Sequence, residues 1–179
     1  MKLSTLAIAL GLGTAALQIF GVFFPAECRN ALRRLPRSLP WGIVFTLAAT
    51  AGFLWNLQQE AISDFASYKP MMLAGFGLLG VATCIFVQDF LAVRGLAVLL
   101  MLLAKVMVDS ARVVDTQWRL VIVVWAYAMV VAGIWFTISP WRMRDLIDWS
   151  TATVERTRNL SVARMGFGLF VAGLGMTVF

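Results

Sequence analysis

The chain has 179 residues, of which 61% are apolar and 13% are charged. A soluble domain usually carries about 25% charged residues, so this composition excludes an ordinary soluble fold and indicates a membrane protein. The sequence lacks histidine and has two cysteines, which argues against haem, a metal site or a disulfide framework, and no cofactor is expected.

Six apolar segments follow one another along the chain, and short loops join them. A helix needs about 20 apolar residues to cross a bilayer. The predicted spans are residues 5–24, 41–57, 71–88, 91–110, 120–138 and 165–179. The predicted fold is therefore an all-α, polytopic transmembrane helical bundle with a single domain over residues 1–179.

The first span could also be a signal peptide, because one lysine precedes an apolar run. The run is longer than a typical signal sequence and no cleavage site follows it, which favours a retained helix. Gly11 and Ala15 form a small-residue pair four positions apart. This pair predicts either a close-packing face or no more than the usual tolerance of small residues in membrane helices.

Two basic segments separate spans. The first, Pro25–Pro40, is expected to be a loop; the second begins with a predicted interfacial helix over residues 140–149, whose alternative is a solvated turn. In that helix we expect Arg142 to pair with Asp145 and Arg144 with Asp148. The loop over residues 58–70, with Glu60, Asp64 and Lys69, has no positive excess.

The basic residues predict the orientation in the membrane. With six spans, ten Arg residues fall on one side and four Lys or Arg residues on the other. The positive-inside rule then places the basic segments in the cytoplasm and both termini in the periplasm of a bacterial inner membrane. The same clustering argues against nucleic-acid binding and predicts contact with anionic lipid headgroups. The predicted cytoplasmic anchors are Arg29, Arg33, Arg34, Arg37, Arg142 and Arg144.

The two basic segments also resemble each other. Each opens with a proline, Pro25 or Pro140, and has an arginine four residues later, Arg29 or Arg144. This similarity indicates either a parallel duplication or the positive-inside rule acting twice, and two matched positions favour the second explanation.

The fourth span carries a stripe of charge. On a helical projection, its charged residues fall within a sector of about 80°, and the other faces are apolar. Lys105 is expected near the membrane midplane if Arg94 marks the cytoplasmic boundary. The spacing of Lys105, Asp109 and Arg112 allows an intramembrane cluster of three charges. The stripe comprises Arg94, Val98, Lys105, Asp109, Arg112, Thr116 and Arg119.

Three interpretations of this stripe remain open. Lys105 and Asp109 could line an ion, proton or solute path. They could form a self-neutralised pair that fixes helix packing or docks a partner, so that the stripe faces the bundle interior, a cavity or another subunit. Alternatively, the span ends near Val108, Lys105 extends to the interface and Asp109 belongs to the loop.

The segment Arg94–Ile147, with its Arg-Gly start, its DTQWR turn and its PWRMRDL sequence, resembles uncharacterised bacterial multi-spanning membrane proteins. The resemblance covers about a third of the chain and implies no activity.

No catalytic motif stands out, so an enzyme is not expected. The sequence favours a non-catalytic accessory or scaffold subunit of a larger membrane complex, with other subunits or further copies of itself as partners. The alternative is a small channel or transporter with its path along Lys105 and Asp109.

Overall fold

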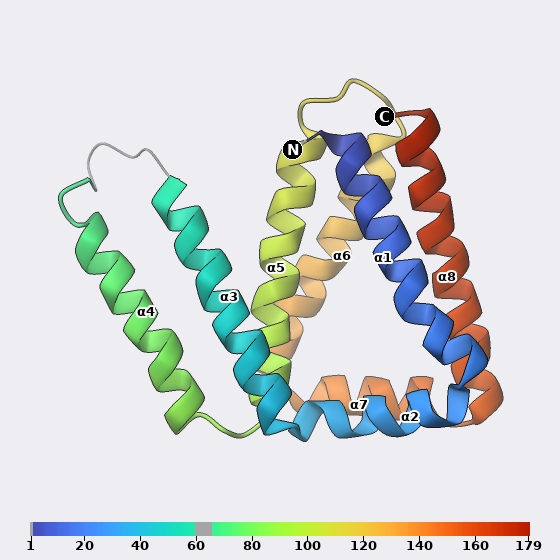
Figure 1. Cartoon of the computed structure of the whole chain (residues 1–179), viewed down its shortest axis with the longest axis horizontal. Coiled ribbons are helices and arrows are strands. Elements are labelled where there is room, and N and C mark those ends of the chain that lie inside the picture. The colour runs from blue at the N-terminus through green and yellow to red at the C-terminus, as the bar shows by residue number, and fades with distance from the viewer. Residues whose placement is uncertain (1, 60–65) are drawn as a thin grey trace. The chain divides into compact units, whose positions relative to one another are not determined.

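The computed structural model describes residues 2–59 and 66–179, and this part of the chain is all-α without strands (Figure 1). Glu60 and Asp64 of the predicted polar loop lie outside the described residues. The predicted fold class is confirmed. The helices are α1 (Leu3–Phe23), α2 (Pro25–Arg34), α3 (Leu39–Gln59), α4 (Lys69–Phe86), α5 (Leu91–Ala111), α6 (Arg119–Ile138), α7 (Trp141–Ser150) and α8 (Val154–Thr177).

Six of the described helices are long and apolar enough to cross a membrane, namely α1, α3, α4, α5, α6 and α8. The protein is therefore a multi-pass membrane protein. The predicted bounds of the first five spans agree with these helices to within two residues. Helix α8 instead begins at Val154 rather than at residue 165, because the Thr153 hydroxyl accepts a hydrogen bond from the Arg156 amide and caps a polar first turn.

The chain divides into two compact units, each described by itself. The α1–α8 unit comprises residues 1–34, 103–131 and 144–179, and the α3–α4 unit comprises residues 35–102 and 132–143. Helices α5 and α6 each contribute residues to both units. The prediction of one transmembrane domain stays a prediction.

Small residues bring α1 and α8 into backbone contact in the α1–α8 unit. A Cβ added at Gly11 would lie 2.5 Å from both the Gly168 carbonyl oxygen and the Ala172 nitrogen. Ala15 is buried, and its nitrogen would lie 2.9 Å from a Cβ at Gly168. The close-packing face predicted from Gly11 and Ala15 is thus confirmed, in the manner of membrane helices that pack through small residues.

The core of this unit lies where α5 and α6 meet the α1–α8 pair. Its buried side chains are Leu3, Leu6 and Ala7 of α1, Ala104, Met107 and Ala111 of α5, Ile122 and Ala126 of α6, and Val171 of α8. Two edge-on aromatic contacts reach α8. Trp125 of α6 contacts Phe167 at a ring-centroid distance of 5.1 Å, and Trp118, just before α6, contacts Phe170 at 6.4 Å. Edge-to-face pairs of this kind add to the packing energy.

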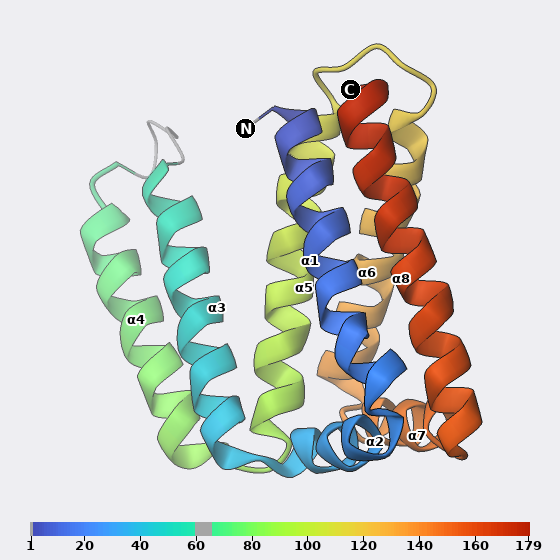
Figure 2. The same ribbon diagram turned by 45° about the vertical axis from the view of Figure 1, so that its right-hand side comes forward.

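Helices α2 and α7 lie at the end of the α1–α8 unit opposite to both termini (Figure 2). The expected loop at Pro25–Pro40 is wrong for its first part, because Pro25–Arg34 is helical and Leu35–Arg37 forms a 3₁₀ turn. Pro25 is compatible with the first turn of a helix, Glu27 lies in that turn, and Arg33 and Arg34 lie in the last turn. These charges complement the helix dipole and favour a helix that hydropathy alone does not indicate.

Glycines also set the packing of the α3–α4 unit. A Cβ at Gly95 of α5 would lie 2.7 Å from the Thr46 nitrogen of α3, and one at Gly42 of α3 would lie 2.9 Å from the Ala92 nitrogen of α5. These two contacts make α3 and α5 run parallel from their first turns. Helix α4 runs antiparallel to α3, with Gly80 against the Thr50 side chain.

We expect Gly11→Ala to destabilise the protein by about 1–3 kcal/mol, because the added methyl group has no room against α8. Gly13→Ala is the matched control on the same helix, since nothing lies within 4 Å of a Cβ there, and it should be neutral or stabilising by up to about 1 kcal/mol. Thermal unfolding of both variants in detergent, followed by circular dichroism, measures the difference. Equal melting temperatures would contradict the close α1–α8 contact.

Candidate functional site

Lys105 and Asp109 form an ion pair on the exposed face of α5. The Lys105 Nζ lies 3.1 Å from the Asp109 Oδ2, and the two side chains are 46% and 52% exposed. Ala104, Met107 and Ala111 are buried in the core of the α1–α8 unit on the other side of the same helix. The two charges therefore project away from the core of their own unit. The expectation that they face a cavity or another subunit stays a prediction.

The structure brings together two of the three charges predicted to cluster, Lys105 and Asp109. Arg112 follows the last residue of α5, and among the described residues it forms no ion pair with Asp109. Arg119 lies at the start of α6, donates a 2.8 Å hydrogen bond to the Val114 carbonyl oxygen and lies 3.6 Å from Asp115. Asp109 is still helical, so the assignment of Asp109 to the loop is wrong. The rest of that interpretation, in which Lys105 extends to the interface, stays a prediction.

Arg33 joins α2 to the C-terminal end of α7. Its guanidinium donates hydrogen bonds of 3.0 Å to the Thr151 hydroxyl and 3.1 Å to the Thr151 carbonyl oxygen, and lies 3.4 Å from Asp148. The predicted pairing of Arg144 with Asp148 is therefore wrong. Arg144 instead pairs with its neighbour Asp145 at 3.0 Å, and this takes the place of the predicted Arg142–Asp145 pair.

The other predicted anchors, Arg29, Arg34, Arg37 and Arg142, form no ion pair or side-chain hydrogen bond within residues 2–59 and 66–179. Arg156 stacks on Trp149, with its guanidinium carbon 3.9 Å from the ring centroid. A cation over an indole face is attracted by the ring quadrupole. Arg33 and Arg156 thus hold α2, α7 and α8 of the α1–α8 unit together. Arg29 and Arg34 of the same unit, and Arg37 and Arg142 of the α3–α4 unit, make no such contact among the described residues.

The thiol of Cys28 on α2 is a titratable group in the same region. Burial raises the pKa of the Cys28 thiol, and the guanidinium of Arg164, which favours the thiolate, opposes that shift. Cys28 also lies near the α1–α2 junction, since its sulfur would be 3.4 Å from a Cβ at Gly21. No three histidine, cysteine, aspartate or glutamate side chains come together in the described part of the chain.

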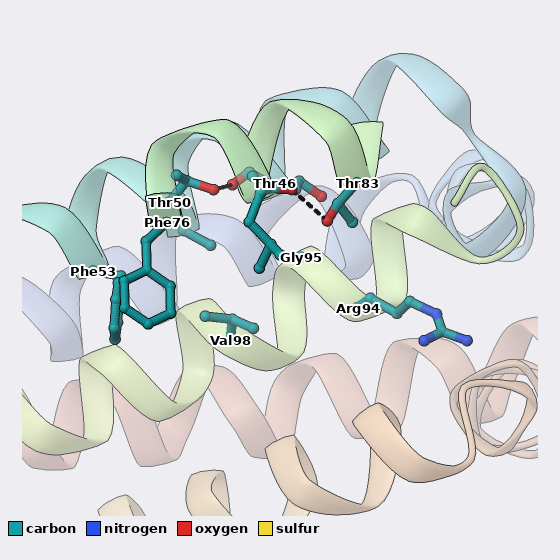
Figure 3. Close-up of a pocket in the computed structure, with 11 residues that line it drawn as sticks. Thr46, Thr50, Phe53, Phe76, Thr83, Arg94, Gly95 and Val98 are labelled. Carbon is teal, nitrogen blue, oxygen red and sulfur yellow. Dashed lines mark hydrogen bonds between the residues drawn. The ribbon is translucent and has the colours of Figure 1, made fainter. Parts of the chain in front are cut away.

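The α3–α4 unit contains a groove that sequence patterns did not indicate (Figure 3). It has a volume of about 270 Å³, and its lining is mostly apolar. Helix α3 contributes Thr46, Ala49, Thr50 and Phe53, α4 contributes Phe76, Leu79, Gly80 and Thr83, and α5 contributes Arg94, Gly95 and Val98. Arg94 and Val98 are the first two members of the predicted stripe, so the stripe begins at this groove.

A comparison of the chain with protein-family models, with curated proteins and with solved structures finds no match. The resemblance to bacterial multi-spanning proteins stays a prediction.

We expect Arg33→Ala to lower the free energy of unfolding by about 1 kcal/mol. Hydrogen bonds to a charged group contribute about 1.5–3 kcal/mol, and partial exposure of Arg33 reduces that value. Arg34→Ala removes the same charge from the next position and should have almost no effect. Unfolding in a denaturing detergent measures both variants, and equal destabilisation would show that Arg33 does not hold α2 to α7.

We expect Cys28 to be alkylated slowly near neutral pH, with a rate that rises at a higher pH than for an exposed thiol, because only the thiolate reacts. Arg164→Gln should move this pH dependence further upward, since it removes the charge that favours the thiolate. Iodoacetamide labelling of a Cys84→Ser background, resolved by mass spectrometry, measures the rate. Arg158→Gln is the control, and an unchanged profile in Arg164→Gln would contradict the assigned cause.

Proposed function

We propose that the protein is a non-catalytic integral membrane subunit, an accessory or scaffold component of a larger bacterial inner-membrane complex. The observation that carries the proposal is the Lys105–Asp109 ion pair on the face of α5 that points away from the core of the α1–α8 unit. We infer that this face packs against a transmembrane helix of another subunit.

The reasoning rests on the energy of charge in a bilayer. A lysine or aspartate at the centre of a membrane helix costs about 2.5–3.5 kcal/mol on insertion scales. Pairing within one helix lowers that cost, yet both side chains remain about half exposed. Lys105 lies four residues beyond the middle of α5, and Asp109 lies two residues before its last residue. Ionisable groups in spanning helices normally face protein or water rather than lipid. A neighbouring helix with polar groups would remove the remaining exposure, and small-residue faces elsewhere show that this chain packs helices closely.

The alternative function, a small channel or transporter, rests on the sequence. Neither the groove of the α3–α4 unit nor a second pocket, formed by Lys2, Ser4, Ser110, Val113 and neighbouring residues near the two termini, includes Lys105 or Asp109. We place the subunit function first because of the half-exposed ion pair on α5, and we retain the transport function as the outcome that a flux measurement would reveal.

The test is purification in a mild detergent from cells that carry the natural gene, followed by mass measurement and identification of stoichiometric partners. We expect a complex larger than one chain, and about a tenfold lower recovery of the partner with Lys105→Met or Asp109→Asn, which corresponds to roughly 1.4 kcal/mol. Lys2→Met is the control, because it removes a lysine at the end of the chain. A wild-type monomer without any stoichiometric partner would overturn the proposal.

Reconstitution into liposomes separates the two functions. The subunit function predicts solute and proton fluxes at background level for both the wild type and Lys105→Met. A flux above background in the wild type that Lys105→Met abolishes would instead establish the transport function.

A further inference from the structure

The groove of the α3–α4 unit has a floor and two walls from three helices. Helix α3 forms the floor, and α4 and α5 approach it from two sides, through Gly80 against Thr50 and through Gly95 against Thr46. Because glycine lacks a side chain, both walls come close to α3 at these points. The apolar side chains of Leu79 and Val98 line the walls further along.

The two ends of the groove differ in chemistry (Figure 3). Arg94 lies at one end. At the other end, Phe53 and Phe76 make an edge-on contact with a centroid distance of 5.0 Å. Thr83 and Phe76 are seven residues apart on α4, which corresponds to about 10 Å along the helix axis. The groove is thus short and apolar, with a cation at one end and an aromatic pair at the other.

Arg94 has no acidic partner in the described residues, since none of the ion pairs of this part of the chain includes it. Arg94 is the fourth residue of α5, so it lies near the N-terminal end of this spanning helix. The hydroxyls of Thr50 and Thr83 donate to the backbone carbonyl oxygens of Thr46 and Leu79. The Thr46 hydroxyl has no hydrogen-bond partner, but it is buried where Gly95 approaches α3, so the lining exposes few free polar groups to an occupant. An occupant must therefore be apolar in the groove and negative at Arg94.

We propose that this groove binds one acyl chain of an anionic phospholipid, whose phosphate pairs with the Arg94 guanidinium. A guanidinium matches the geometry of a phosphate through two parallel hydrogen bonds. The headgroup of phosphatidylglycerol keeps the full negative charge of its phosphate, whereas the choline cation of phosphatidylcholine offsets that charge and is repelled by Arg94. The volume of about 270 Å³ suits part of one chain rather than a whole lipid, so the second chain remains in the bilayer. This site is independent of the proposed function, because it uses neither Lys105 nor Asp109.

The test titrates the purified protein in detergent with phosphatidylglycerol or phosphatidylcholine of identical chains and counts bound lipids by native mass spectrometry. We expect at least fivefold tighter binding of phosphatidylglycerol to the wild type. Arg94→Gln should remove this preference and Arg94→Lys should retain most of it. Val98→Trp should weaken the binding of both lipids by filling the groove.

Arg142→Gln is the matched control, because Arg142 belongs to the same unit but does not line the groove. Equal binding of the two lipids by the wild type, or an unchanged preference in Arg94→Gln, would overturn the proposal. So would a co-purified protein helix in the groove in place of lipid.

A second measurement does not depend on removing Arg94. Phe53→Trp adds a fluorescent side chain in the groove to the seven tryptophans of the chain. The quenching that this variant shows in excess of the wild type should occur at lower concentration of phosphatidylglycerol with brominated chains than of brominated phosphatidylcholine. Equal quenching by the two lipids would contradict the site even if Arg94→Gln fails to fold.

Discussion

The close approach of α1 and α8 is the constraint on which the α1–α8 unit depends. Lipid tails are as apolar as leucine, so membrane helices gain little from hydrophobic burial and associate where small residues let backbones touch. Gly11, Gly168 and Ala172 provide such a contact. It brings the first and last helices together, and this places both termini at one end of the unit and α2 and α7 at the other (Figures 1 and 2).

Helix α5 uses different faces for different neighbours. Ala104, Met107 and Ala111 enter the core of the α1–α8 unit, whereas Gly95 makes the close contact with α3. Lys105 and Asp109 lie on the side of α5 opposite to that core, so their charges stay out of contact with its buried apolar side chains. The charged stripe is compatible with tight packing because the side of α5 that enters the core carries small and apolar residues.

Sequence patterns predicted the apolar helices well because hydropathy over about 20 residues is a strong signal. They missed helix α2 and the first turns of α8, where helix formation follows from caps and charge placement rather than from apolar residues. They also missed the partner of Arg33, which is 118 residues away at Thr151 and cannot be found from local spacing. The groove was beyond prediction for a similar reason, because it depends on how three helices meet.

The arginines show why a charge count and a structure carry different information. The positive-inside rule treats every arginine on one side of the membrane alike. In the structure Arg33 donates hydrogen bonds to Thr151, Arg156 lies over the ring of Trp149, and Arg94 lies at the end of an apolar groove. The guanidinium groups of Arg33 and Arg156 contact other helices of this chain and help to hold them together. Arg94 is different because its surroundings are apolar and its charge is unopposed, and for that reason it marks a site for a negative group.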